Sequence, residues 1–375
     1  MAKRSAIVVG AGIAGLATAL ALSKKEYQVK VFDRTQQAVG ASIRNFGMVW
    51  PIGQPSGTLY ETAMRSRSIW KEISDTGAFW HEPAGSLFVA HHPDEWNVLQ
   101  EVYEIFTPER AVSLVTPSQI AERTEAVVQK NLLGGLFSSA ELIVDPREAI
   151  TSLPGYLEHK YGVAFYWAKC ISYVADNTVY IGNDEAYEAD IVFICSGADF
   201  ETLYPEAYAK QPVTKCKLQM MRLAEQPDGW RIGPALCGGL TLIHYESFRK
   251  AASLKAVRNR LELTMNDYID LGIHVMVSQN GKGELTIGDS HEYGPSPDPF
   301  DKECINRMVL EYLRQFAQFK TDTVVESWNG VFAKPTDGSP YLFFSPESGV
   351  YIFNGLGGAG MTMSFGLAEE LLAGL

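Results

Sequence analysis

Short apolar runs and helical patterns alternate at the start of the chain. Residues 5–10 include the run Ala6-Ile-Val-Val-Gly, which predicts a short buried strand. Residues 14–24 then carry apolar side chains at helical spacing, and residues 28–33 alternate between polar and apolar positions as a second strand does. A strand, a helix and a strand within about 30 residues predict a βαβ unit of the kind that binds a mononucleotide.

The rest of the chain mixes the same two patterns. We expect a loop rich in glycine and proline over residues 40–57, followed by an amphipathic helix over residues 59–74. Short strands and acidic helices are expected over residues 85–144. Further helices are predicted at 146–160, near 248–270, at 300–316 and at the end of the chain. Further strands are predicted at 163–187 (a meander that turns at Asp176 and Asn177), 190–197, 217–223, 239–244, 274–278, 284–288 and 350–353.

Nucleotide-type patterns occur at both ends of the sequence and in its middle. We therefore predict an α/β protein with a doubly wound, Rossmann-like domain that is discontinuous, made of residues 1–84, 145–212 and 331–375. Residues 85–144 and 213–330 are predicted to form a second, substrate domain on a mixed, largely antiparallel sheet. A chain of 375 residues is long enough for two domains of this size.

Charge and cysteine content exclude several classes of function. The chain has 32 lysines and arginines against 44 acidic residues, a formal charge of −12, which disfavours binding to nucleic acid or to an anionic membrane. Its five cysteines show no Cys-x-x-Cys spacing, so we expect no metal site and no disulfide framework, and a cytoplasmic location. No segment approaches about 20 uninterrupted apolar residues, so no membrane span is expected.

A glycine pattern lies between the first predicted strand and the first predicted helix. In Gly10-Ala-Gly12-Ile-Ala-Gly15, Gly10 permits a tight turn, Gly12 lets the backbone approach a pyrophosphate, and Gly15 lets the helix pack closely on the strand. The helix N-terminus then offers unpaired N–H groups to the phosphates. Asp33 ends the second strand, where its carboxylate can accept hydrogen bonds from ribose hydroxyls and repels a 2′-phosphate. The pattern predicts a dinucleotide site, but it does not separate FAD from NAD.

A second glycine-rich junction near the C-terminus favours a flavin. Residues 354–362 join the last predicted strand to the last helix and contain Gly355, Gly357, Gly358 and Gly360. Backbone N–H groups and a helix N-terminus at such a junction can stabilise the negative charge that gathers on the pyrimidine ring of a reduced flavin. An NAD enzyme has no use for this element.

Together these motifs resemble the D-amino-acid oxidase superfamily, and within it the glycine and sarcosine oxidase branch. The resemblance extends over the N-terminal unit, the Gly40-Ala-Ser42 loop, residues 190–197, Leu285-Thr-Ile-Gly288 and the segment from Asp337 to Gly360. It implies a domain that binds FAD non-covalently, with Ser42 and its neighbours around the pyrophosphate and ring, Ile171 at the adenosine end and Gly197 at a second nucleotide-side turn. The cofactor-binding residues expected on this basis are Gly10, Gly12, Ile13, Ala14, Gly15, Asp33, Arg34, Ala41, Ser42, Arg44, Asn45, Phe46, Gly47, Met48, Ile171, Gly197, Gly330, Gly355, Gly357, Gly358, Gly360, Met361 and Thr362.

The sequence departs from that branch at several functional positions. The glycine oxidase pattern has a substrate-clamping arginine two residues after the glycine that matches Gly330, and here that residue is Phe332. Gly330 itself stands where the branch's flavin-tethering cysteine would be, so covalent attachment is not expected. Thr286 occupies the place of a lysine linked with oxygen activation, and a terminal-loop lysine of some sarcosine oxidases is replaced near Thr362. These departures put an ordinary amino-acid substrate in doubt.

The segment from Ala41 to Gln54 resembles a clade of these oxidases associated with phosphonate catabolism. That resemblance implies oxidative deamination of an aminophosphonate related to 2-aminoethylphosphonate. Phosphonate oxygens favour several or forked donors. The candidate substrate-binding residues are Arg44, Trp50, His244, Tyr245, Arg249, Trp328 and Lys334. Each has an alternative: Arg44 can pair with the flavin, the tryptophans can belong to the core, and Lys334 and the His244-Tyr245 pair can be ordinary surface or packed residues.

The expected reaction is hydride transfer from the carbon that bears the amine to flavin N5, and the resulting imine then hydrolyses. The flavin performs the chemistry, so no catalytic acid or base is assigned. A glycine, sarcosine or D-amino-acid oxidase is the main alternative, and a flavin-dependent hydroxylase is a distant one. The expected partners are a small anionic amine and O2 or another electron acceptor. The sequence leaves the oligomeric state open, a homo-oligomer included.

Overall fold

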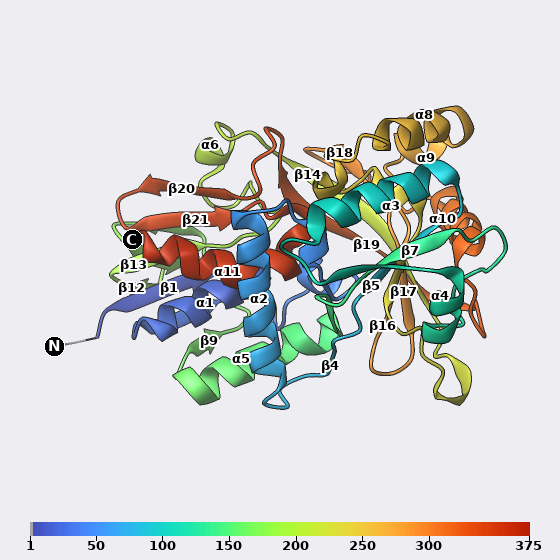
Figure 1. Ribbon diagram of the computed structural model, residues 1–375. Coiled ribbons are helices and arrows are strands. Elements are labelled where there is room, and N and C mark those ends of the chain that lie inside the picture. The colour runs from blue at the N-terminus through green and yellow to red at the C-terminus, as the bar shows by residue number, and fades with distance from the viewer. Residues whose placement is uncertain (1–2) are drawn as a thin grey trace.

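A computed structural model describes residues 3–375 and shows a mixed α/β fold in two parts (Figure 1). The first part, at the left of the view, is built on a six-stranded sheet in the order β20-β21-β13-β1-β2-β9. Its strands run parallel from β21 to β9, and only β20 is antiparallel. The strands are β1 (Ser5–Val9), β2 (Gln28–Phe32), β9 (Ala164–Tyr166), β13 (Ile191–Ile194), β20 (Leu342–Glu347) and β21 (Val350–Asn354).

Side chains of β1 alternate between the two faces of this sheet, as a strand requires. Ala6 and Val8 pack under helices, whereas Ile7 packs on the opposite side. The helical face is covered by α1 (Ile13–Lys24), α2 (Thr58–Ser74), α5 (Pro146–Tyr161) and α11 (Gly360–Ala373). A small antiparallel sheet of β10 (Tyr173–Ala175), β11 (Thr178–Ile181) and β12 (Glu185–Glu188), with α6 (Pro205–Tyr208), lies on the other face.

The second part is a nine-stranded sheet in which every pairing is antiparallel except that of β5 with β15. Its order is β18-β14-β17-β16-β15-β5-β7-β6, and β19 pairs with β14 along almost its whole length. The strands are β5 (Ser86–Ala90), β6 (Val112–Val115), β7 (Gly134–Ser138), β14 (Val213–Leu223), β15 (Ala235–Cys237), β16 (Met276–Gln279), β17 (Leu285–Gly288), β18 (Glu292–Gly294) and β19 (Val324–Pro335). Its helices are α3 (Pro93–Phe106), α4 (Pro117–Arg123), α7 (Gly239–Leu242), α8 (Leu254–Thr264), α9 (Asn266–Asp270) and α10 (Glu303–Phe316).

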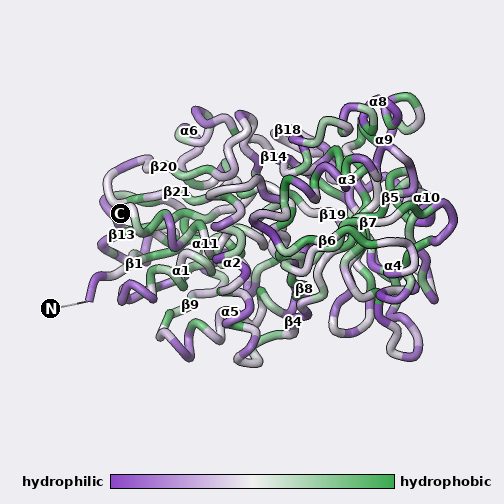
Figure 2. Tube along the Cα trace, in the orientation of Figure 1, coloured by the Kyte–Doolittle hydropathy of each residue, from purple (hydrophilic) through white to green (hydrophobic). Residues whose placement is uncertain are grey.

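A short three-stranded sheet and five turns of 3₁₀-helix complete the described elements. The sheet contains β3 (Met48–Val49), β8 (Leu142–Val144) and β4 (His81–Glu82) in the order β3-β8-β4. The turns of 3₁₀-helix are η1 (Ala41–Ile43), η2 (Pro51–Gly53), η3 (Pro227–Gly229), η4 (Glu246–Phe248) and η5 (Gly357–Ala359). In Figure 2 the hydrophobic segments follow the strands inside both parts, and the hydrophilic ones lie mostly at the outer loops and helices.

The structure corrects one predicted element. Residues 239–244 were expected to form a strand, but Gly239–Leu242 form the short helix α7, and the strand of this region is β15, which begins four residues earlier. β15 already has β5 on one side and β16 on the other, so no sheet edge is free there for a second strand. The amide of Leu240 instead donates to Tyr312 Oη (2.8 Å). Strands β19 and β20, which the sequence did not indicate, complete the two sheets, and β15 and β18 were not predicted either.

Among the described residues, no helix is both long enough and apolar enough to span a membrane.

Candidate active site

One large cavity, of about 1000 Å³, lies where the two parts meet. Its walls come from the carboxyl ends of β1, β2 and β13, the loop after β2, strand β19 and the start of α11. Ligands of open α/β sheets bind in the crevice at the carboxyl ends of the strands, so this position is expected for a cofactor. The cavity continues past β14 and β16 into the second part, which leaves room for a smaller molecule beside the cofactor.

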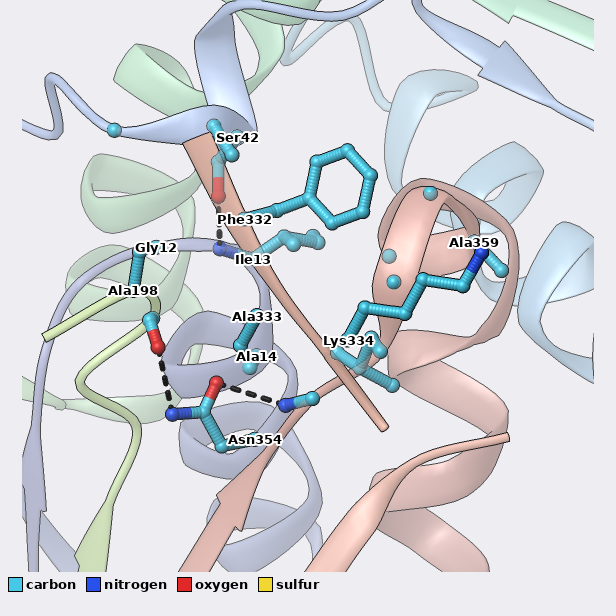
Figure 3. Close-up of a pocket in the computed structure, with 18 of the residues that line it drawn as sticks. Gly12, Ile13, Ala14, Ser42, Ala198, Phe332, Ala333, Lys334, Asn354 and Ala359 are labelled. Atoms are coloured by element: carbon cyan, nitrogen blue, oxygen red, sulfur yellow. Dashed lines mark hydrogen bonds between the residues drawn. The ribbon is translucent and has the colours of Figure 1, made fainter. Parts of the chain in front are cut away.

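The glycines after β1 let the turn after β1, the start of α1 and the end of β13 approach one another. Gly10 has φ +103°, and a Cβ there would lie 2.3 Å from Cys195 O. A Cβ on Gly15 would lie 1.8 Å from Gly10 O, so Gly15 serves helix packing and does not line the cavity. Gly12 begins α1 without a side-chain cap of its own, and Ser42 Oγ accepts from Ile13 N (2.9 Å; Figure 3). The uncapped start of α1 fits a pyrophosphate.

Asp33 is fixed at the end of β2 by its own hydrogen bonds. Its Oδ2 accepts from Ala11 N (2.8 Å), and its Oδ1 accepts from Thr35 N (2.9 Å) and Thr35 Oγ1 (2.8 Å). These bonds hold the carboxylate at the cavity wall, beside the first glycine turn. Arg34, next to it, also lines the cavity and forms an ion pair with Asp199.

The C-terminal junction forms the opposite wall. Asn354 Nδ2 donates to Gly197 O (2.8 Å), and its Oδ1 accepts from Gly355 N (2.8 Å), so this amide ties the turn after β13 to the turn after β21 (Figure 3). Gly355 and Gly357 have φ values of +66° and +56°, which glycine adopts without strain. Helix α11 begins at Gly360 with no side-chain cap, so its first N–H groups are available to a ligand.

Most of the cofactor-binding residues predicted from the sequence meet at this cavity. Gly15 and Gly47 are the two that do not line it. A Cβ on Gly47 would lie 1.9 Å from Val144 O, so Gly47, like Gly15, allows close packing of backbone. The lining residues of this set are Gly10, Gly12, Ile13, Ala14, Asp33, Arg34, Ala41, Ser42, Arg44, Asn45, Phe46, Met48, Ile171, Gly197, Gly330, Gly355, Gly357, Gly358, Gly360, Met361 and Thr362.

Of the predicted substrate-binding residues, Trp328 alone lies away from the cavity. Its ring lies between the guanidinium groups of Arg147 (5.3 Å) and Arg222 (5.6 Å). Arg249 reaches the rim, but its side chain is 69% exposed and pairs with Glu246. The other five, Arg44, Trp50, His244, Tyr245 and Lys334, all line the cavity.

Two basic residues enter the cavity from different elements. Arg44 Nη1 donates to Asn329 O on β19 (3.0 Å), which leaves the rest of its guanidinium available. Lys334, on β19, donates to Tyr293 Oη (3.1 Å) and points toward the start of α11 (Figure 3). Phe332, two residues before Lys334, places an apolar ring in the same wall. The cavity therefore combines positive charge with an apolar surface that excludes water.

The sequence reasoning missed a cluster of ionisable residues on the side of the second part. His274, Asp289 and His291 line the cavity together with His244. The ring of His244 stacks on that of His274 with centroids 3.6 Å apart, and each of the three histidines has a ring nitrogen within 4.8 Å of the others. No local spacing signals this cluster, because the pairing of β16 with β17 brings residues 274 and 289–291 together.

Burial sets the protonation of this cluster. Burial lowers the pKa of His291 to about 4, and it also holds the pKa values of His244 and His274 well below the usual histidine range. The neighbouring Lys334 ammonium acts in the same direction on all three. Burial also raises the pKa of Asp289, whose Oδ1 lies 3.0 Å from His274 Nε2.

Comparison with known proteins agrees with the fold and the cavity. The sequence matches the FAD dependent oxidoreductase family over residues 5–373. Glycine oxidase from Geobacillus kaustophilus is 18% identical, with a TM-score of 0.76 over 100% of this chain and 95% of its own. L-proline dehydrogenase from P. horikoshii is 19% identical (TM-score 0.77; 99% and 94%), and iminodiacetate oxidase from Chelativorans sp. BNC1 is 19% identical (TM-score 0.73; 98% and 94%). Comparison with curated proteins finds no significant match.

Proposed function

The chain belongs to the family of FAD-dependent oxidoreductases, and from this premise we propose that it oxidises a small amine that carries a phosphonate group, an aminophosphonate related to 2-aminoethylphosphonate. The supporting observation is that the usual substrate-clamping arginine is absent, while two other basic residues line the cavity. Phe332 stands where the glycine oxidase pattern has its arginine, while Arg44 and Lys334 bring positive charge into the same cavity from other positions. Two separated cations suit an anion with three oxygens better than a planar carboxylate.

The residues around the cavity bind and orient the substrate. Bound FAD supplies the acceptor for a hydride from the carbon that bears the amine. Arg44 and Lys334 hold the anionic end, and the rings of Trp50 and Phe332 exclude water around the carbon chain. A substrate held at its anionic end presents its carbon–nitrogen end to the cofactor, and this positioning is the main contribution that the protein makes to the rate.

FAD fits the cavity without a covalent bond to the protein. Gly330 replaces the tethering cysteine on β19, and the cysteines that line the cavity are Cys170 and Cys195. Both lie on the side of β2, β9 and β13, where the structure fits the nucleotide, and Cys195 is buried against Thr18. Acid precipitation of the holoenzyme should therefore leave all of the yellow flavin in the supernatant. Flavin in the protein pellet would contradict a non-covalent complex.

The similar enzymes support an amine substrate. Glycine, proline and iminodiacetate, the compounds named in those enzymes, all carry a nitrogen close to an anionic group. A glycine, sarcosine or D-amino-acid oxidase is therefore the second candidate, and it retains the amine chemistry with a carboxylate as the anionic group.

Anaerobic reduction of the flavin tests the proposal directly. We expect 2-aminoethylphosphonate or a close derivative (N-methylated or hydroxylated) to bleach the flavin absorbance faster, at equal concentration, than glycine, sarcosine or D-alanine. Ethylphosphonate, which lacks the amine, serves as the matched control and should cause no bleaching. Preference for an amino acid would replace the phosphonate proposal by the second candidate, and flavin reduction by NADH alone would indicate a hydroxylase.

A further inference from the structure

His274 and His291, which are buried, and His244, which is half-buried, offer ring nitrogens to the cavity. His291 Nδ1 lies 3.0 Å from Gly272 O, and a carbonyl only accepts, so Nδ1 carries the hydrogen and Nε2 is left for a ligand. His274 Nδ1 is buried and, among the described residues, has no hydrogen-bond partner. Asp289 Oδ1 also lacks one, although it lies 3.0 Å from His274 Nε2. Buried polar atoms of native proteins are normally satisfied, so these point to a ligand.

We propose that His244, His274 and His291 form a subsite for a tetrahedral oxyanion, the phosphonate end of the substrate, and that the subsite takes up a proton when the anion binds. The inference rests on the proposed function and extends it, because it adds residues on the side of the second part to Arg44 and Lys334 as groups that hold the anionic end of the substrate. These residues are separate from the glycine-rich walls that fit FAD.

Ring geometry favours an oxyanion over a metal ion. The lone pair of an imidazole nitrogen lies in the plane of its ring, so a single metal ion must lie in the planes of all its histidine ligands. The rings of His244 and His274 stack with centroids 3.6 Å apart and planes inclined by only 26°, so their planes do not meet near the nitrogens. Stacked rings can instead each offer a nitrogen to a different oxygen of one tetrahedral anion.

The charges around the cluster also favour an oxyanion over a metal ion. The Lys334 ammonium lowers the pKa of all three imidazoles, and the same positive charge would oppose a divalent cation. Burial raises the pKa of Asp289, which disfavours a carboxylate charge beside the cluster. The remaining titratable groups that face the cluster are phenols and a thiol, which burial keeps neutral: Tyr245 beside His244, Tyr293 on β18 and Cys216 on β14.

The donors and acceptors of His291 and of the anion explain why a proton is taken up. Neutral His291, with its hydrogen on Nδ1, can only accept at Nε2, and an anion also only accepts. A fully ionised oxyanion therefore becomes a good ligand when Nε2 gains a proton from solvent, and the anion in turn stabilises the imidazolium. Binding of such an anion should weaken as the pH rises, by roughly tenfold per pH unit where one proton is taken up.

Sulfate is the probe for the test, because it is tetrahedral and has no titratable proton between about pH 5 and 9. We expect FAD-saturated holoenzyme to bind sulfate with the uptake of about one proton, measured by calorimetry at pH 7 in two buffers of different ionisation enthalpy. Substitution His291→Gln keeps a polar group but cannot gain the proton, and should weaken sulfate binding at least tenfold and remove the uptake. His274→Gln should weaken binding as well. His159→Gln, on the exposed face of α5, is the matched control and should bind sulfate as the wild type does.

The results separate this inference from the proposed function. Sulfate cannot be oxidised, so binding and proton uptake are measured without turnover. Wild-type binding without proton uptake would overturn the inference, as would wild-type sulfate affinity in both His291→Gln and His274→Gln. A stoichiometric divalent metal that is found in purified wild type and lost from these variants would replace the subsite by a metal site. Flavin bleaching by aminophosphonates decides the proposed function, whatever the outcome with sulfate.

Discussion

Gly12 stands at the point where α1, the Ser42 loop and the cavity meet. A Cβ at this position would lie 3.1 Å from Ser42 Oγ, the atom that accepts from Ile13 N. A larger side chain must displace that hydroxyl or project into the space for the pyrophosphate.

We expect Gly12→Val to lose FAD. The added methyl groups leave no room for the phosphates, so the ratio of flavin absorbance to protein absorbance after desalting should fall at least tenfold. Gly155→Ala is the matched control, because a Cβ at Gly155, at an exposed position of α5, meets no atom within 4 Å. Full flavin occupancy in Gly12→Val would mean that the cofactor lies elsewhere.

Arg44 and Lys334 are expected to act on the substrate. Removing a buried charge-assisted hydrogen bond costs about 1.5–3 kcal/mol, so Arg44→Ala and Lys334→Ala should each lower kcat/KM for the aminophosphonate by roughly ten- to a hundredfold. Steady-state kinetics with flavin content measured on the same samples provides the check, and Lys210→Ala, at an exposed lysine, is the control. A variant that loses only flavin would show that its residue serves the cofactor.

At the scale of elements, the wall of the cavity between Trp50 and Ser56 is held from behind by one arginine. Arg110 follows α3 and is 6% exposed, and it donates to Ile52 O (3.1 Å), Gln54 O (2.8 Å) and Ser56 Oγ (3.1 Å). Its guanidinium stacks on the rings of Tyr60 and Phe106, 4.1 and 3.9 Å from their centroids. Together with Thr362 Oγ1, which accepts from Trp50 N, and Glu141 Oε1, which accepts from Ile52 N, this side chain fixes a segment that has little regular structure of its own.

Arg110→Met should loosen this wall without emptying the cofactor site. Methionine fills much of the volume but leaves three acceptors, one buried and two half-buried, without this donor, so we expect a loss of stability on the order of 3 kcal/mol. The midpoint of thermal unfolding should fall and KM should rise, while FAD stays bound. Arg314→Met removes an exposed pair with Asp322 and should change stability by less than about 1 kcal/mol. Equal effects of the two substitutions would refute the proposed role of Arg110.

Elements with a local signal could be predicted from the sequence. The βαβ unit, the turn at Asp176 and Asn177, and the last helix match the structure within a few residues because each has its own periodicity or turn residues. The apolar stretch at 239–244 was misassigned because its strand-like composition says nothing about whether a sheet edge is free. The domain boundaries at residues 84/85, 144/145, 212/213 and 330/331 stay a proposal.

The residues of the candidate site also fall into those that have a local signal in the sequence and those that do not. Glycines next to predicted strands indicate the cofactor walls, since the motif and its spacing are local in sequence. The cluster of His244, His274 and His291 depends on strand pairing and on a loop after α7, so no spacing in the sequence could indicate it. Trp328 was a candidate because of its residue type alone, and its contacts with Arg147 and Arg222 depend on a strand that the sequence did not reveal.

At the scale of the whole molecule, the buried histidines link stability to pH. The pKa of His291 is lowered by burial to about 4, whereas an unfolded histidine titrates near 6.5. Between these values the unfolded chain binds a proton that the folded protein does not, so this contribution to stability is complete above pH 6.5 and is lost as the pH falls toward 4.

We therefore expect wild type to lose more stability than His291→Gln on acidification. The difference at pH 5 should be about 2 kcal/mol for this one residue. Thermal unfolding at pH 7 and pH 5, in buffers free of sulfate and phosphate, gives the comparison. Identical pH dependence in the two proteins would show that His291 is not held neutral in the folded state.

The packing of α11 against α1 and α2 also sets an order of events during synthesis of the chain (Figure 1). Ribosomes add about 5–20 residues per second, so α1 emerges roughly 20–70 s before the last helix is available to cover it. Most residues of α1 are buried in the finished protein. The apolar side chains that α11 covers therefore lack that contact over the whole interval. The same delay applies to the cofactor, because Gly355–Gly360 complete its cavity only at the end. FAD should therefore bind only after residues 355–360 have been synthesised.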